Sequence, residues 1–130
     1  MCWTNSMAIP IVLKKPLRVY KVGISTTSGN FISLYQDFVY YESRTVPTIE
    51  ITPEFIRFYY PCTYEFKFLG RDNFDIHKGY HSYLTKEAAW HNQDDKDIGI
   101  FEIPAGATIY VNYKRKEVVS TDIEYLGLLE

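Results

Sequence analysis

The sequence KGYHSYLTKEAAWH, residues 78–91, changes from a strand-like to a helix-like pattern within a few residues. In its first half, side chains would alternate along an extended strand, so that His81 and Tyr83 share one face. Thr85 is a residue type that caps helices, and the residues after it favour a helical turn. The segment therefore predicts a strand that ends beside one short helix near residues 85–92.

The remainder of the chain alternates between apolar and polar residues in short runs that are bounded by turn residues. The clearest run is 17–24, where Val19 and Lys21 would share one face with Leu17. Further strand-like runs occupy residues 31–35, 38–41, 48–51, 55–60, 64–69, 98–103, 107–113, 118–120 and 123–128. We therefore expect an α+β fold that is mainly antiparallel β with one short helix.

The proline pattern suggests where the domain begins. Pro10 and Pro16 interrupt the first residues, so we expect residues 1–16 to be a leader without a regular element and residues 17–130 to form a single β-rich domain. The leader carries apolar side chains, among them Ile11 and Val12, that need a surface to cover them. We expect a homo-oligomer, at least a dimer, on this ground.

Composition excludes several classes of protein. The formal net charge of the 130 residues is -2, so no global positive field would attract duplex nucleic acid. Cys2 and Cys62 form no CxxC pair, which predicts neither a zinc site nor a redox pair and favours a cytoplasmic protein. No apolar run is long enough to span a bilayer, and we expect no membrane contact. The acidic loop near Asp94 and Asp97 is no calcium loop, because Lys96 takes a ligand position.

Tyrosine is the most prominent residue type. The chain has 12 Tyr and 8 Phe, and each Tyr hydroxyl must reach water or a partner. Half-exposed tyrosine rings suit stacking on bases or contact with proteins. The alternative is that they simply cover the two faces of a sheet.

No complete catalytic or phosphate-binding motif is present: GxxxxGK[ST], GxGxxG, GxSxG and HExxH are all absent. His81 is the best candidate for a base, and the alternative is a structural histidine at the end of a strand. Cations beside tyrosine rings suit a nucleotide, because the ring stacks on the base and the cation meets the phosphate. We predict a ligand site made of His81, Ser82, Tyr83, Arg71, Arg18 and Tyr20, with no metal and no cofactor.

Three segments carry a resemblance: YKV at residues 20–22, GYHSYLTKEA at 79–88 and IPAG at 103–106. With them the sequence resembles a group of small phage and bacterial proteins. The resemblance implies no defined activity. Phage genes of this size often encode antagonists of host defence, some of which sequester nucleotide signals. On this ground we expect a role in sequestering a nucleotide signal in the host cytoplasm.

A second pattern is similar to ADP-ribosyltransferase folds, which place a His or Arg on the first strand, a Tyr or Ser before a helix, and a Glu on a late strand. Arg18 or Tyr20, Ser82 or Tyr83, and Glu102 or Glu124 follow that order. The Gly-Thr that follows the first-strand histidine in such enzymes is absent.

The function expected from the sequence is binding of a small anionic ligand, a nucleotide above all, by a module that is not an enzyme. An ADP-ribosyltransferase-like enzyme is the first alternative, and a protein-binding or virion structural component is the second.

Overall fold

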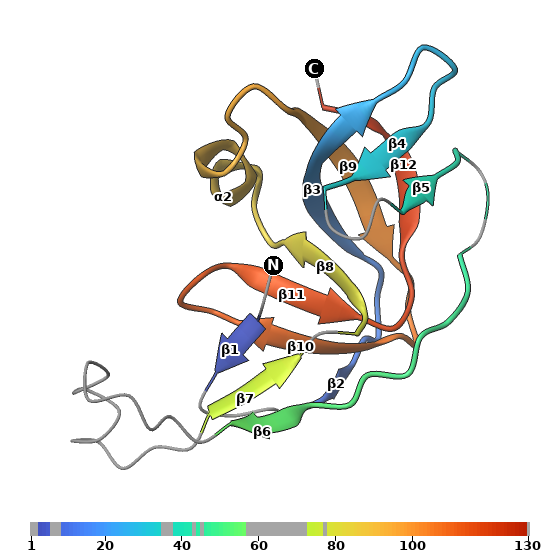
Figure 1. Ribbon diagram of the computed structural model, residues 1–130. Helices are drawn as coiled ribbons and strands as arrows, with labels where there is room; N and C mark the ends of the chain where they lie inside the picture. The colour runs from blue at the N-terminus through green and yellow to red at the C-terminus, as the bar shows by residue number, and fades with distance from the viewer. Residues whose placement is uncertain are drawn as a thin grey trace.

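The computed structural model describes residues 3–5, 9–34, 38–42, 44, 46–56, 73–76 and 78–129, and it places short strands along most of them (Figure 1). The strands are β1 (Trp3–Asn5), β2 (Ile11–Val12), β3 (Leu17–Ser25), β4 (Phe31–Ser33), β5 (Val39–Tyr40), β6 (Glu54–Ile56), β7 (Asn73–Ile76), β8 (Tyr80–Tyr83), β9 (Asp97–Ile103), β10 (Thr108–Asn112), β11 (Glu117–Ser120) and β12 (Glu124–Leu128). The helix in this part of the chain is α2 (Lys86–His91).

Two antiparallel sheets organise these strands. The larger has the order β12-β9-β3-β8-β11-β10-β2, with β4 and β5 added beside β3, and the smaller has the order β1-β7-β6. Every pairing among the described strands is antiparallel. The predicted fold class, α+β and mainly antiparallel β with one short helix, is confirmed.

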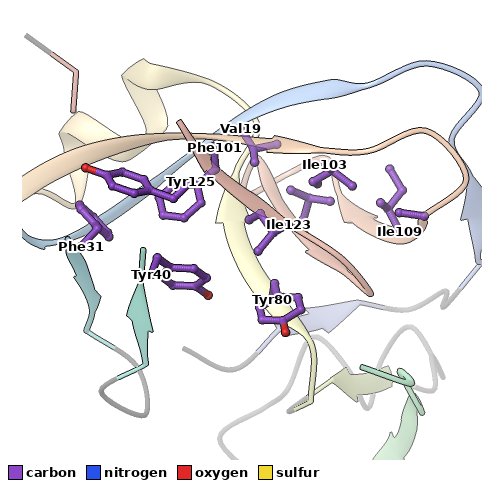
Figure 2. Packing of buried hydrophobic residues seen from close by; sticks show 11 residues of the cluster. Val19, Phe31, Tyr40, Tyr80, Phe101, Ile103, Ile109, Ile123 and Tyr125 are labelled. Carbon is purple, nitrogen blue, oxygen red and sulfur yellow. The ribbon is translucent and has the colours of Figure 1, made fainter. Parts of the chain in front are cut away.

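Strand β3 runs through the middle of the larger sheet, and its alternation separates two packed faces. On one face, Val19 joins a cluster in which the rings of Phe31, Tyr40 and Tyr125 surround Phe101 (Figure 2). The centroid of the Phe101 ring lies 5.4 Å from Phe31, 4.9 Å from Tyr40 and 5.0 Å from Tyr125. Rings at these separations and mutual tilts pack favourably, so this cluster is the main core.

Helix α2 covers part of the other face. Ala89 is buried against Val22, Tyr83 and Ile98. The Thr85 hydroxyl accepts a hydrogen bond from the backbone N–H of Ala88 at 3.2 Å, which satisfies one of the donors left open at the start of the helix. The helix cap predicted at Thr85 is therefore confirmed. β8 ends two residues before it, at Tyr83.

The first residues differ from the expected leader, because they contain two short strands. β1 pairs with β7, and β2 pairs with β10 through Ile11 opposite Ile109. Pro10 stands just before β2 and so removes no hydrogen bond from this pairing. Ile11 and Val12 are nevertheless exposed, and the prediction that a second copy covers them remains a prediction.

Two further differences concern the middle of the chain. Residues 48–51 do not form the expected edge strand; instead, Ile49 donates one backbone hydrogen bond to Thr121. β7 forms at Asn73–Ile76, outside the strand-like runs expected from the sequence. The predicted strand 64–69 and the end of the run 55–60 lie outside the described residues.

Candidate functional site

A gap in the pairing of β3 creates the candidate site. One edge of β3 pairs with β9 without interruption from Leu17 to Gly23. The other edge pairs with β8 at Tyr20 and with β4 from Gly23 onward, so Lys21 and Val22 lie between the two partners. Figure 1 shows β8 beside the lower part of β3 and β4 beside its upper part. We call this place the β3 gap.

A cavity of about 270 Å³ lies at the β3 gap. This volume is just below the range of about 300–1,000 Å³ that is usual for small-molecule sites. Its walls come from both faces of the sheet, because the gap leaves no continuous ladder to separate them. The cavity is lined by Lys21, Val22, Ser33, Leu34, Tyr40, His81, Tyr83 and Asn92.

Lys21 is the most unusual residue of this cavity, since only 6% of it is exposed. Its ammonium group donates a hydrogen bond to the backbone carbonyl of His81 and so bridges β3 and β8 where their ladder stops. Its Nζ atom also lies 5.4 Å from the centre of the Tyr40 ring and 5.9 Å from that of Phe101. Burial lowers the pKa of Lys21 to about 7. Near neutral pH this amine is therefore present in both its charged and its neutral form.

Two phenol groups line the same cavity. Burial, and then the neighbouring Tyr80, raise the pKa of Tyr40. Burial also raises the pKa of Tyr83, as does the nearby Glu117, whereas Arg115 lowers it. Both phenols therefore keep their protons at neutral pH and are able to donate hydrogen bonds.

Glu117 stands next to the cavity as a buried acid. It is the register partner of Tyr83 on β11 and is 4% exposed. Burial raises its pKa, and Arg115, whose Nε lies 3.4 Å from its Oε1, acts in the opposite direction. Among the described residues, its Oε2 atom has no hydrogen-bond partner.

The predicted site residues divide into three groups. His81 and Tyr83 line the cavity. Ser82 projects to the opposite face of β8, where it is buried beside its register partner Val118. Tyr20 packs under α2, and Arg18 is exposed near the start of β3. Arg71 lies outside the described residues.

The residues behind the ADP-ribosyltransferase resemblance lie in rows across the sheet. Arg18 stands opposite Glu102 on β9, which stands opposite Glu124 on β12. Tyr20 stands opposite Tyr83 on β8. None of the three residues of the first row lines the cavity.

Sequence reasoning passed over Lys21 and Tyr40. The signal for Lys21 was available, because strict alternation in residues 17–24 puts it on the same face as Val19. A lysine is normally expected to reach solvent, so this position was not interpreted as part of a site. Tyr40 and Ser33 reach the cavity through the pairing of β4 with β5, which no local pattern reveals.

Within the described part of the chain, no group of three or more His, Cys, Asp and Glu residues could hold a metal ion. The same residues include no helix that is long and apolar enough to cross a membrane. Comparisons of the chain with protein families, with curated proteins and with solved structures found no match.

Proposed function

We propose that the protein binds a small anionic ligand of the nucleotide class in the cavity at the β3 gap. The observation that carries the proposal is the buried amine of Lys21 at the cavity wall. Its hydrogen-bond acceptor is a backbone carbonyl, and no carboxylate among the described residues forms an ion pair with it. An anion in the cavity would supply the opposite charge that this buried cation lacks.

The rest of the cavity supports a ligand with a ring. Tyr40 and Tyr83 supply aromatic surface and phenol donors, and Leu34 and Val22 supply apolar surface. The cavity volume of about 270 Å³ favours a single nucleotide or a smaller molecule over a dinucleotide. A base stacked on a tyrosine ring would contribute on the order of 1–3 kcal/mol.

Calorimetry with nucleoside monophosphates and with inorganic phosphate tests the proposal. Only the charged form of Lys21 attracts the anion, and its pKa is about 7. We therefore expect the affinity to fall by up to roughly tenfold per pH unit above pH 7, with uptake of a proton on binding. Absence of binding by every monophosphate, or an affinity that is constant from pH 7 to pH 9, would contradict the proposal.

Two variants locate the site. Lys21→Met removes the cation and should abolish binding, whereas Lys114→Met, in the exposed turn after β10, should leave it unchanged. Tyr83→Phe keeps the ring and removes one hydrogen bond, so we expect a loss of about twofold to tenfold. We prefer it to Tyr83→Ala, because Tyr83 packs against Ala89 and Ile98 and its truncation would also disturb the fold.

The biological role belongs to the same proposal. On the ground of the sequence resemblance, we propose that the protein sequesters a nucleotide signal, in the cytoplasm of a host if a phage encodes it. A thermal-shift screen addresses it, because a ligand at 100 times its dissociation constant stabilises the folded protein by about 2.7 kcal/mol. Incubation with labelled NAD addresses the enzyme alternative, for which transfer of the label or loss of NAD would be the positive result.

A further inference from the structure

We propose that Lys21 is also a covalent site, at which its amine condenses with the aldehyde or ketone group of a small ligand to form an imine. The inference rests on the part of the proposed function that makes the cavity a ligand site. It does not depend on the proposed class of ligand. It assigns to the chain a carbonyl-trapping activity in addition to reversible binding.

The surroundings of the amine provide the first argument. An imine forms only from a neutral amine, and a lysine becomes neutral at physiological pH when it is buried without an opposite charge. The Lys21 amine has such surroundings, with the Tyr40 and Phe101 rings within 6 Å and no ion pair to a carboxylate of the described chain. Burial in these surroundings lowers the pKa of Lys21 to about 7.

The position of the amine provides the second argument. A hydrogen bond to the His81 carbonyl holds the amine at the wall of the cavity. A neutral amine uses one of its hydrogens for that bond, and its lone pair remains available to attack a carbon atom. The fixed amine therefore meets a ligand without first losing the freedom of a surface lysine.

The reaction also needs a proton donor, and the cavity contains candidates. The amine nitrogen adds to the carbonyl carbon and gives up one proton, and the carbonyl oxygen takes up one proton, which gives a carbinolamine. The nitrogen then gives up its second proton, and with it the hydrogen bond to His81, while its lone pair forms the C=N bond and the hydroxyl group leaves with a proton as water. One amine and one carbonyl thus give one imine and one water without a change of oxidation state. Tyr83, whose phenol is protonated at neutral pH, and His81 line the cavity, and we propose them as the groups that move these protons.

Reductive trapping on the full chain tests the inference. The protein is treated at pH 7 with less than one equivalent of pyridoxal 5′-phosphate, or separately of propanal, and the imine is reduced with a borohydride. Peptide mass spectrometry then gives the label on each lysine. With a pKa of about 7, half of Lys21 is neutral at pH 7, compared with about one part in three thousand for an ordinary lysine. Lower basicity and restricted access reduce this advantage, and we expect Lys21 to be labelled at least tenfold faster than Lys78 or Lys114.

The outcomes are distinct. Preference for Lys21 with either aldehyde supports the inference, and equal or slower labelling of Lys21 with both aldehydes overturns it. Lys21→Met should lose the preferred label and keep the labels on the other lysines. This result would assign the preferred label to Lys21 and exclude a change in folding as the cause of its loss. Protection of Lys21 by a nucleoside monophosphate would support both proposals. Preferred labelling of Lys21 in a protein that binds no monophosphate would support the covalent site and overturn the nucleotide function. Binding of a monophosphate without preferred labelling of Lys21 would support the nucleotide function and overturn the covalent site.

Discussion

Replacement of Lys21 by methionine should stabilise the protein at low pH and destabilise it at high pH. Methionine keeps most of the length of the side chain but carries no charge, and the adjoining cavity accepts the small difference in volume. Two quantities oppose each other. The variant no longer buries a charge, and it leaves the carbonyl of His81 without the hydrogen bond that Lys21 donates.

The pKa values give the magnitude. Lys21 has a pKa near 10.5 in the unfolded chain and of about 7 in the folded one. Below pH 7 both states bind the proton, and the folded wild-type protein bears a cost of about 5 kcal/mol. Between pH 7 and pH 10.5 unfolding takes up one proton, so the free energy of unfolding of the wild type rises by about 1.4 kcal/mol per pH unit. The lost hydrogen bond costs the variant about 1–3 kcal/mol at every pH.

Lys21→Met should therefore be more stable than the wild type by about 2–4 kcal/mol at pH 6 and less stable by up to about 2 kcal/mol at pH 10. Urea denaturation of both proteins at intervals from pH 6 to pH 10 measures the difference, in which the titration of the tyrosines cancels. Lys114→Met serves as a surface control, with a difference that stays near zero. A difference between Lys21→Met and the wild type that is the same at all pH values would refute burial as the cause of the low pKa.

Three other changes test the core, the helix and the buried acid. Phe101→Ala should lower the free energy of unfolding by about 3–5 kcal/mol in urea, because Phe101 is fully buried at the centre of the aromatic cluster; a loss below 1 kcal/mol would mean that the cluster is not the core. Thr85→Ala should cost about 1 kcal/mol in thermal denaturation through loss of the cap, and Thr85→Ser should restore it. Glu117→Gln should gain stability relative to the wild type as the pH rises from 4 to 7. The reason is that burial raises the pKa of Glu117, so ionisation of this carboxyl group destabilises the folded wild type as the pH rises. Denaturation curves that show the reverse trend would mean that the effect of Arg115 on this pKa outweighs that of burial.

Local sequence patterns predicted the elements that are long enough to show a period. Residues 17–24 alternate over eight positions and lie within β3, and Thr85 caps the predicted helix, which begins at Lys86. Strands of two or three residues show no period, and β1 and β2 exist because β7 and β10 offer them distant backbone partners. Such pairing is a tertiary effect that composition cannot reveal.

The candidate site was predicted in part for the same reason. Alternation placed His81 and Tyr83 on one face, and both line the cavity. The cavity itself depends on where β8 and β4 stop along β3, which is a property of the assembled sheet. Lys21 belongs to it because tertiary packing overrides the usual preference of lysine for solvent.

The β3 gap also bears on how such a protein could diversify. The cavity is bounded by the ends of β4 and β8 and by the residue after α2, whereas β3 and β9 keep an unbroken ladder behind it. Substitutions at Ser33, Leu34 or Asn92 would therefore reshape the cavity without altering the register of that ladder. A sheet that leaves one edge of a central strand uncovered can exchange ligand specificities during evolution while its framework stays constant.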